Sequence, residues 1–308
     1  MTIAHISDLH LNFEGKHTNY KKVENLLKEV TSLEPDHLVI SGDISEDGRL
    51  EDFDFLRELL IKFKYLDSAL TTIIVGNHDI YGTALSIEDA LLYPDRCKGT
   101  DYDFNLKRFH SFFEELMVDT HRISENDVYP YIKQVGAFFI LALNSIEEFS
   151  TRNFTASNGF IKKEQKLKAE QLLDNFVSKG SPLLLAIHHH FYKIKRQKDT
   201  FAGQILTKIE NNTMKLRKKK KLLATLEKWG VSHILHGHFH DQKIYEIGNI
   251  VFSNSGGSIK NGHATFAKYN LLEFTDEGNF ITTRTINTES FELQNQVQGY
   301  CSAFDPVI

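Results

Sequence analysis

The chain has 308 residues, of which 41% are hydrophobic and 25% are charged, and these values are ordinary for a folded globular protein. Its formal net charge is −5, whereas proteins that hold long nucleic acids usually carry a dominant basic face. Nucleic acid is therefore not an expected partner. The basic run at residues 215–221 is expected to be the solvated start of an amphipathic helix, and a phosphate-steering role is the weaker alternative.

The two cysteines and the hydropathy of the chain indicate the cellular compartment in which we expect the protein. Cys97 and Cys301 are far apart and have no CxxC spacing, which predicts two free thiols in a reducing compartment. No apolar leader follows Met1, and no apolar run is long enough to span a bilayer. We therefore expect a cytoplasmic protein that does not enter a membrane.

Five short apolar segments are predicted to be buried strands, and each ends in residues of metal-ligand type. They are residues 3–7 before Asp8 and His10, 37–41 before Gly42-Asp43, 72–75 before Gly76-Asn77-His78-Asp79, 183–187 before His188, and 233–236 before Gly237-His238-Phe239-His240. Ligands in open α/β sheets gather where strands end. The pattern predicts a metal site with more ligands than one ion needs.

Helical patterns alternate with these strands at residues 20–33, 50–63, 162–177 and 215–229, where apolar residues recur at helical spacing. Such alternation predicts an α/β fold with parallel strands joined by right-handed crossovers. Two long connections interrupt the rhythm. Residues 81–124 include an expected aromatic-rich helix at 106–116, and residues 191–213 are polar and lysine-rich, as lids, binding loops or disordered tracts often are.

After His240 the hydrophobic period changes to two. Residues 244–247, 250–253, 269–274 and 280–283 are predicted to be antiparallel strands that close a second sheet, and 131–134 with 138–143 form another pair. The candidate ligands extend from Asp8 to His240, so one site uses most of the chain. This favours a single domain over 1–308, with C-terminal strands and a tail at about 264–308.

Each motif alone is weak evidence, because a lone Gly-Asp after a strand is usually a turn or a helix cap. Together and in this order, Asp8-x-His10, Gly42-Asp43, Gly76-Asn77-His78-Asp79, His188 and Gly237-His238-x-His240 resemble the motif set of calcineurin-like metallophosphoesterases, including the class III cyclic-nucleotide phosphodiesterases. The resemblance covers roughly residues 1–260. It implies a four-layer α/β/β/α sandwich, two mixed sheets flanked by helices, with a dinuclear metal centre at the strand ends.

The resemblance also implies roles for individual residues. Asp43 would bridge two divalent ions, and the other ligands would divide between them. One ion would be held by Asp8, His10, Asp43 and His240, and the other by Asp43, Asn77, His188 and His238. Mixed imidazole and carboxylate ligands suit Mn, Fe or Zn. Such a pair lowers the pKa of a bridging water, so that hydroxide can attack phosphorus in line at neutral pH.

Two histidine assignments leave alternatives open. The resemblance implies that His78 contacts the phosphoryl or leaving-group oxygen, with Asp79 orienting it and favouring its protonated form. The alternative is that His78 is structural. In the run 188–190 we choose His188 as the ligand because it comes first after the strand, with His189 as the alternative. His190 is expected to be exposed or to shape the pocket.

The expected activity is therefore hydrolysis of a small phosphoester, most plainly a phosphodiester such as a cyclic nucleotide. Many cyclic-nucleotide members continue the third motif with Asp-Arg, where this chain has Ile80-Tyr81-Gly82. One alternative is a DNA nuclease of the Mre11/SbcD group, which the acidic net charge disfavours. Another is a non-catalytic scaffold, although such relatives usually lose ligands. The expected partner is a small phosphoester without nucleic acid or membrane, and a homo-oligomer stays open.

Overall fold

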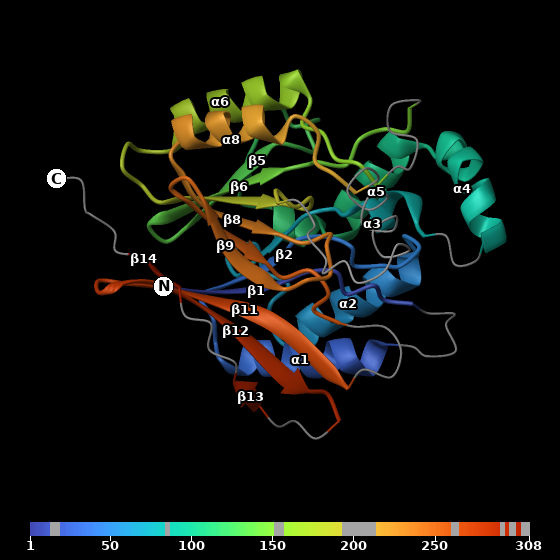
Figure 1. Ribbon diagram of the computed structural model, residues 1–308, viewed down its shortest axis with the longest axis horizontal. Coiled ribbons are helices and arrows are strands. Elements are labelled where there is room, and N and C mark those ends of the chain that lie inside the picture. The colour runs from blue at the N-terminus through green and yellow to red at the C-terminus, as the bar shows by residue number, and fades with distance from the viewer. Residues whose placement is uncertain are drawn as a thin grey trace, which may run out of the picture.

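The computed structural model describes residues 1–12, 19–83, 87–150, 157–192, 214–259, 265–289, 293–295 and 300–302. Two mixed sheets lie face to face, with helices α6 and α8 over one outer surface and α1 and α2 over the other (Figure 1). The architecture is the predicted α/β/β/α sandwich.

The first sheet has the strand order β13-β12-β11-β1-β2-β3, and β14 pairs with β12. Its strands are β1 Thr2–Ile6, β2 His37–Ile40, β3 Thr71–Ile73, β11 Phe266–Thr275, β12 Gly278–Asn287, β13 Leu293–Asn295 and β14 Tyr300–Ser302. Strands β1, β2 and β3 run parallel, as the strand–helix alternation predicts. Strand β11 pairs antiparallel with the other edge of β1.

The second sheet has the order β4-β5-β6-β7-β8-β10-β9. Its strands are β4 Thr120–His121, β5 Tyr131–Val135, β6 Phe138–Leu143, β7 Leu183–Ile187, β8 Val231–His236, β9 Lys243–Ile247 and β10 Ile250–Asn254. Strands β6, β7, β8 and β10 run parallel. Parallel strands covered on both faces are apolar throughout, and all five residues of β7 are buried.

One prediction about the sheets is wrong. The four period-two segments after His240 do not close one second sheet but divide between both sheets. Strands β9 and β10 extend the sheet of β8, whereas the β11–β12 hairpin joins β1. Alternation of apolar and polar residues identifies a half-buried strand, but it carries no information about the strand's partner.

Four helices cover the sheets, namely α1 Tyr20–Ser32, α2 Leu50–Lys62, α6 Lys163–Phe176 and α8 Lys219–Lys228. Their apolar stripes face inward, and in α1 Val23, Leu26, Leu27 and Val30 are buried. The first three begin and end within one residue of their predicted limits. Helix α8 begins four residues later than residue 215, because Lys218 has a φ of 55° and the preceding segment forms a β-bridge from Leu216 to Gly159.

The predicted connection at 81–124 folds into several short elements. Helix α3 Asn77–Tyr81 leads into it, and α4 Ile87–Gly99, α5 Tyr102–Phe112 and the 3₁₀ turn η1 Glu114–Met117 follow. The helix expected at 106–116 starts earlier, because the Asp101 carboxylate caps it by accepting from the Phe104 N–H at 2.9 Å. Nearly all of the other connection, 191–213, and parts of the tail at 264–308 lie outside the described residues.

Alternate residues of the central strands face different layers. In β7, Leu184 and Ala186 belong to the core shared with the first sheet, whereas Leu183, Leu185 and Ile187 pack with α6 and α8. The described Cys97 is a buried free thiol. No helix among the described residues has the length and apolar character needed to cross a bilayer.

Buried Lys133 on β5 predicts a pH-dependent stability. Its side chain is buried, and Nζ donates to the carbonyls of Thr71 at 2.6 Å and Leu116 at 2.9 Å. Burial lowers the pKa of Lys133 from 10.5 to about 7. Between these two values the unfolded chain binds more protons, so the free energy of unfolding rises with pH, by roughly 5 kcal/mol at most.

The Lys133→Met variant should lack this contribution. Urea unfolding of both proteins at pH 7, 8.5 and 10 isolates the effect, because the other titrating groups are shared and cancel in the difference. We expect the free energy of unfolding of the native chain to increase relative to that of the variant as the pH rises. Parallel pH profiles would show that Lys133 has an ordinary pKa in the folded chain.

Candidate metal centre

The candidate ligands all follow strands at one edge of the two sheets. Asp8 and His10 follow β1, Asp43 follows β2, Asn77 follows β3, His188 follows β7, and His238 and His240 follow β8. Because these strands are parallel within each sheet, their carboxyl ends lie at a common edge. Residues from both sheets thus meet, although more than two hundred positions separate the first from the last.

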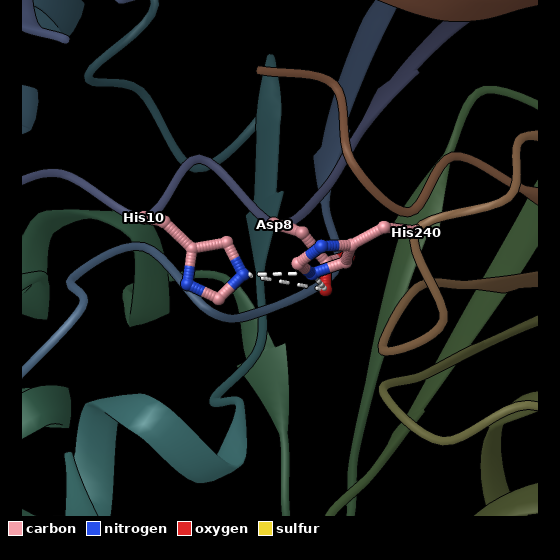
Figure 2. Close-up of side chains that lie close together, drawn as sticks. All are labelled: Asp8, His10 and His240. Carbon is pink, nitrogen blue, oxygen red and sulfur yellow. Dashed lines mark hydrogen bonds and ion pairs between the residues drawn. The ribbon is translucent and has the colours of Figure 1, made fainter. Parts of the chain in front are cut away.

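One group consists of Asp8, His10 and His240, whose rings and carboxylate converge in Figure 2. His240 Nε2 lies 3.2 Å from Asp8 Oδ1 and 2.9 Å from His10 Nε2. Asp8 and His10 are buried, but 49% of the His240 side chain is exposed. The group therefore opens to solvent on the His240 side, and its three donor atoms could hold one divalent ion.

A second group consists of Asp43, His188 and His238, all of which are buried. His188 Nε2 lies 3.2 Å from Asp43 Oδ2 and 3.2 Å from His238 Nδ1. The same Asp43 oxygen lies 4.0 Å from His10 Nε2 in the first group. Asp43 therefore stands between the two groups, where one carboxylate can serve both.

The structure distinguishes among the three consecutive histidines. His188 Nδ1 donates to the Ser41 carbonyl at 2.8 Å, which leaves Nε2 facing Asp43 as the nitrogen that can bind a metal ion once its proton is lost. Both nitrogens of His189 are occupied, by the Ser145 hydroxyl at 2.8 Å and the Ser157 carbonyl at 3.1 Å. The geometry therefore favours His188 over His189 as the ligand.

His190 was expected either to be exposed or to shape the pocket, and the structure shows that it is buried. It is only 2% exposed, and its ring lies 5.0 Å from that of Tyr192 and 5.8 Å from that of His238. Its Nδ1 is buried and has no hydrogen-bond partner among the described residues. This ring helps to form the wall beside the second group.

Unsatisfied buried atoms test whether the residues present fit metal ions. The Asn77 Oδ1 atom is buried and has no partner within the described part of the chain. A buried polar atom without a partner typically costs about 1–3 kcal/mol, so native structures rarely leave one. A metal ion would supply the missing partner of Asn77, and the carboxylate, amide and imidazole donors suit Mn, Fe or Zn. The residues therefore fit a dinuclear centre.

Electrostatics in the two groups favour ionised carboxylates. Burial opposes the charge on Asp43, but nearby His188 and other histidines outweigh it and hold the pKa of Asp43 well below its usual range. Burial likewise opposes the charge on His188, yet Asp43 raises the pKa of His188 to about 9. Metal binding must displace this proton, so loading of the centre should release protons.

Backbone conformation marks the same loops. Of the seven non-glycine residues with positive φ in the described chain, four are candidate ligands: Asp8 at 54°, His10 at 45°, Asp43 at 52° and His238 at 70°. Left-handed conformations cost non-glycine residues about 1 kcal/mol or more and collect at functional sites. The fold holds these residues in conformations that a free loop would rarely adopt.

The expected pairing of Asp79 with His78 is wrong. The Asp79 carboxylate accepts from the backbone N–H groups of Ile44 at 2.9 Å, Ser45 at 3.0 Å and Gly76 at 2.8 Å. It therefore ties the loop after β2 to the loop after β3. Asp79 begins a helical turn together with His78, and adjacent helical side chains do not face one another. We assign Asp79 to shaping the centre instead of orienting His78.

Glu46 lies next to His78, and no sequence motif indicates this role for it. Its Oε2 lies 2.9 Å from His10 Nδ1 and its Oε1 lies 3.7 Å from His78 Nδ1, which also contacts the Glu46 carbonyl at 3.1 Å. Burial opposes its charge, but His10 and His78 lower the pKa of Glu46 to about 2. The loop after Gly42-Asp43 contains more than one acidic residue, so the sequence does not distinguish Glu46 from its acidic neighbour.

Position 76 has no room for a side chain beside Asp43, so it requires glycine. A Cβ atom there would lie 2.1 Å from Asp43 Oδ1 and 2.2 Å from the Asp43 backbone nitrogen. Its φ of −107° suits any residue, so crowding alone forbids a side chain. We expect Gly76→Ala to displace Asp43 and to weaken Mn²⁺ binding by about 10–100-fold, measured by isothermal titration calorimetry.

Gly99→Ala is the matched control for this prediction, because nothing lies within 4 Å of the added Cβ. The control should bind Mn²⁺ like the native chain. Unchanged Mn²⁺ affinity in Gly76→Ala would mean that Asp43 is not held as the structure shows.

Known proteins resemble this chain over most of its length. The sequence model described as calcineurin-like phosphoesterase matches residues 1–242. A probable cyclic nucleotide phosphodiesterase of Ruthia magnifica subsp. Calyptogena magnifica is 22% identical over 298 residues, which are 94% of this chain and 97% of that protein.

Two solved structures share the fold. A dimetal phosphatase from Danio rerio aligns with 92% of this chain and 95% of its own, with a TM-score of 0.57 and 13% identity. GAP50, the anchor in the inner membrane complex of Plasmodium, aligns with 99% and 90%, with a TM-score of 0.52 and 12% identity. At such identities the likeness shows the fold alone, while the sequence match shows the family. The chain belongs to the calcineurin-like phosphoesterase family.

Proposed function

We propose that this protein is a dinuclear-metal-dependent phosphodiesterase that hydrolyses a cyclic nucleotide or another small phosphodiester. The observation that carries the proposal is the position of Asp43, whose Oδ2 lies 3.2 Å from His188 in one ligand group and 4.0 Å from His10 in the other. A carboxylate shared between two groups is what a pair of neighbouring divalent ions needs. That both sheets contribute ligands also supports a single domain over residues 1–308.

The two ions, Mn, Fe or Zn, would supply Lewis-acid charge to the phosphoryl oxygens and an activated water. Asp8, His10, Asp43 and His240 would hold one ion, and Asp43, Asn77, His188 and His238 the other. Only two of these ligands, Asp8 and Asp43, are anionic, so the loaded centre keeps a positive surplus that attracts an anionic phosphodiester. The buried sides of both groups exclude water except near His240.

His78 is proposed to move a proton. Its backbone N–H donates to Asp43 Oδ1 at 2.9 Å, which fixes the residue beside the shared carboxylate. Its Nδ1 can donate to the Glu46 carbonyl at 3.1 Å, which leaves Nε2 available to the substrate. The side chain is 21% exposed, so a substrate can reach it. In this position His78 would protonate the leaving-group oxygen.

The preference for a cyclic nucleotide rests on the sequence relative, which is described as a probable cyclic nucleotide phosphodiesterase and aligns over nearly its whole length. A substrate panel with added Mn²⁺ tests it, comparing cyclic nucleotides, nucleoside monophosphates, glycerophosphodiesters, bis-p-nitrophenyl phosphate and short DNA. We expect a cyclic nucleotide and the aryl diester to be hydrolysed, monoesters more slowly, and a chelator to stop both reactions.

Other outcomes of the panel would replace the proposal. Cleavage of short DNA in preference to every small diester would identify a nuclease. Failure to retain metal or to hydrolyse any substrate would identify a non-catalytic scaffold. Faster hydrolysis of monophosphates than of diesters would identify a phosphomonoesterase.

A further inference from the structure

A basic hollow lies where helices α6 and α8 begin, and the candidate metal centre does not use it. Its volume is about 240 Å³, and five cationic side chains line it: Lys163, Lys166, Arg217, Lys218 and Lys221. Buried Ile161 and Leu222 contribute apolar surface. Among the described residues that line it there is no aspartate or glutamate. This concentration of positive charge contrasts with the net charge of −5 for the whole chain.

The hollow is separate from the metal centre but close to its supporting residues. Gly159 lies against His189, because a Cβ atom on Gly159 would lie 2.5 Å from the His189 ring. Phe160, the next residue, lines the hollow. None of the residues that line the hollow is a candidate metal ligand, so a ligand bound there would not occupy the metal centre.

Aromatic and acidic neighbours hold two of the cations in place. The Arg217 guanidinium carbon lies 5.0 Å from the centre of the Phe160 ring, and Lys218 Nζ lies 5.1 Å from it. Glu147 pairs with one end of Arg217, while the buried Arg217 Nε has no acceptor within the described residues. Lys163, Lys166, Lys218 and Lys221 pair with no described carboxylate. The hollow thus contains positively charged hydrogen-bond donors that outnumber the described carboxylates able to pair with them.

The two helix ends add to the positive potential. Lys162 and Lys218 occupy the N-cap positions of α6 and α8, and neither helix end has a side-chain cap. The helices run side by side over the outer face of the second sheet (Figure 1). Cations near the positive end of a helix dipole are unfavourable. An anion in the hollow would offset this repulsion.

We propose that the hollow binds a small phosphate-bearing anion at a second site. Five cations exceed what a single carboxylate needs, and lysine and arginine together are the usual partners of phosphate oxygens. The apolar surface of Ile161 and Leu222 leaves room for a non-phosphate part of the ligand. The proposal is independent of the hydrolytic function and holds whether or not the metal centre turns over phosphodiesters.

Pyrophosphate is the probe for this site. Isothermal titration calorimetry on the full chain, at 0.15 M NaCl and with or without EDTA, separates the hollow from the metal centre, because EDTA removes metal-dependent binding. We expect saturable one-to-one binding that persists in EDTA and weakens as salt is added. The variant Lys166→Gln/Lys218→Gln/Lys221→Gln should bind about tenfold more weakly or worse.

The matched control is Lys98→Gln/Lys179→Gln/Lys228→Gln, which removes the same charge from exposed lysines that do not line the hollow. It should bind pyrophosphate within about twofold of the native chain, since screening at this salt limits distant charges. Both variants should keep native metal content and the native rate on bis-p-nitrophenyl phosphate, which shows that each is folded.

Several results would overturn the proposal. The first is the absence of saturable pyrophosphate binding in EDTA. The second is an equal loss of pyrophosphate affinity in both triple variants. The third is weak binding without saturation, which would mean an adventitious ion only. Cosedimentation with phosphatidylcholine vesicles containing phosphatidylinositol phosphate tests the other source of a phosphate group. Binding to such vesicles without binding to pyrophosphate would assign the hollow to a lipid headgroup instead of a free anion.

Discussion

Replacing Asp43 by asparagine should lower the rate of phosphodiester hydrolysis by about 10³-fold or more, which corresponds to roughly 4 kcal/mol of transition-state stabilisation. The reason is the shared position of this carboxylate. Asp43 Oδ2 faces His188 at 3.2 Å and His10 at 4.0 Å, and Oδ1 accepts the His78 N–H at 2.9 Å. Asparagine keeps the shape but offers one neutral oxygen, so the second group loses its only carboxylate and the first keeps only that of Asp8.

Hydrolysis of bis-p-nitrophenyl phosphate with Mn²⁺, together with elemental analysis of bound metal, measures this effect. Metal content should fall along with activity. The control Asp54→Asn makes the same chemical change at an exposed position of α2 and should leave both unchanged. If Asp43→Asn kept two metals per chain, the carboxylate would not be the bridge that we propose.

Replacing His78 by alanine should lower kcat by about 10²–10⁴-fold, the range expected when a general acid is lost. Metal content should stay near that of the native chain, because neither metal set that we propose includes His78. Elemental analysis and steady-state kinetics measure both effects, and loss of metal from His78→Ala would show that His78 is a ligand instead.

Glu46→Gln distinguishes the positioning role of Glu46 from a structural one. Glu46 lies 2.9 Å from His10 Nδ1 and 3.7 Å from His78 Nδ1, so the change should weaken metal affinity by about 10–100-fold and also lower kcat. Glu46→Asp should recover part of both losses. A variant that only unfolded more easily, with native Mn²⁺ affinity and kcat below its unfolding temperature, would contradict this role.

The local spacing of apolar residues predicted much of the fold, because this spacing shows which face of a helix or strand is buried. The stripe through Val23, Leu26, Leu27 and Val30 indicated a helix with one buried face, and that face is buried. The apolar run of β7 indicated a strand covered on both sides. The sequence could not show which sheet receives the β11–β12 hairpin, since an alternating strand fits any free edge of suitable length.

The candidate site divides in the same way. Motifs at the strand ends identified both Asp8 and His240, and the structure brings them within 3.2 Å. The choice between His188 and His189 needed the tertiary structure, because it depends on hydrogen bonds of the two rings to residues in distant segments. Glu46 was overlooked, and Asp79 was given the wrong partner, because each contact crosses between loops.

By itself the sequence determined the family, the types of ligand and their places at the ends of buried strands, since these follow from residue identity and hydrophobic period. Tertiary structure alone decided which acid lies beside His78 and which backbone groups the Asp79 carboxylate contacts. It also brought the lysines at the start of α6 against those at the start of α8 to form one basic hollow. These features depend on contacts between distant segments, and side-chain direction across such contacts is set by packing and not by local pattern.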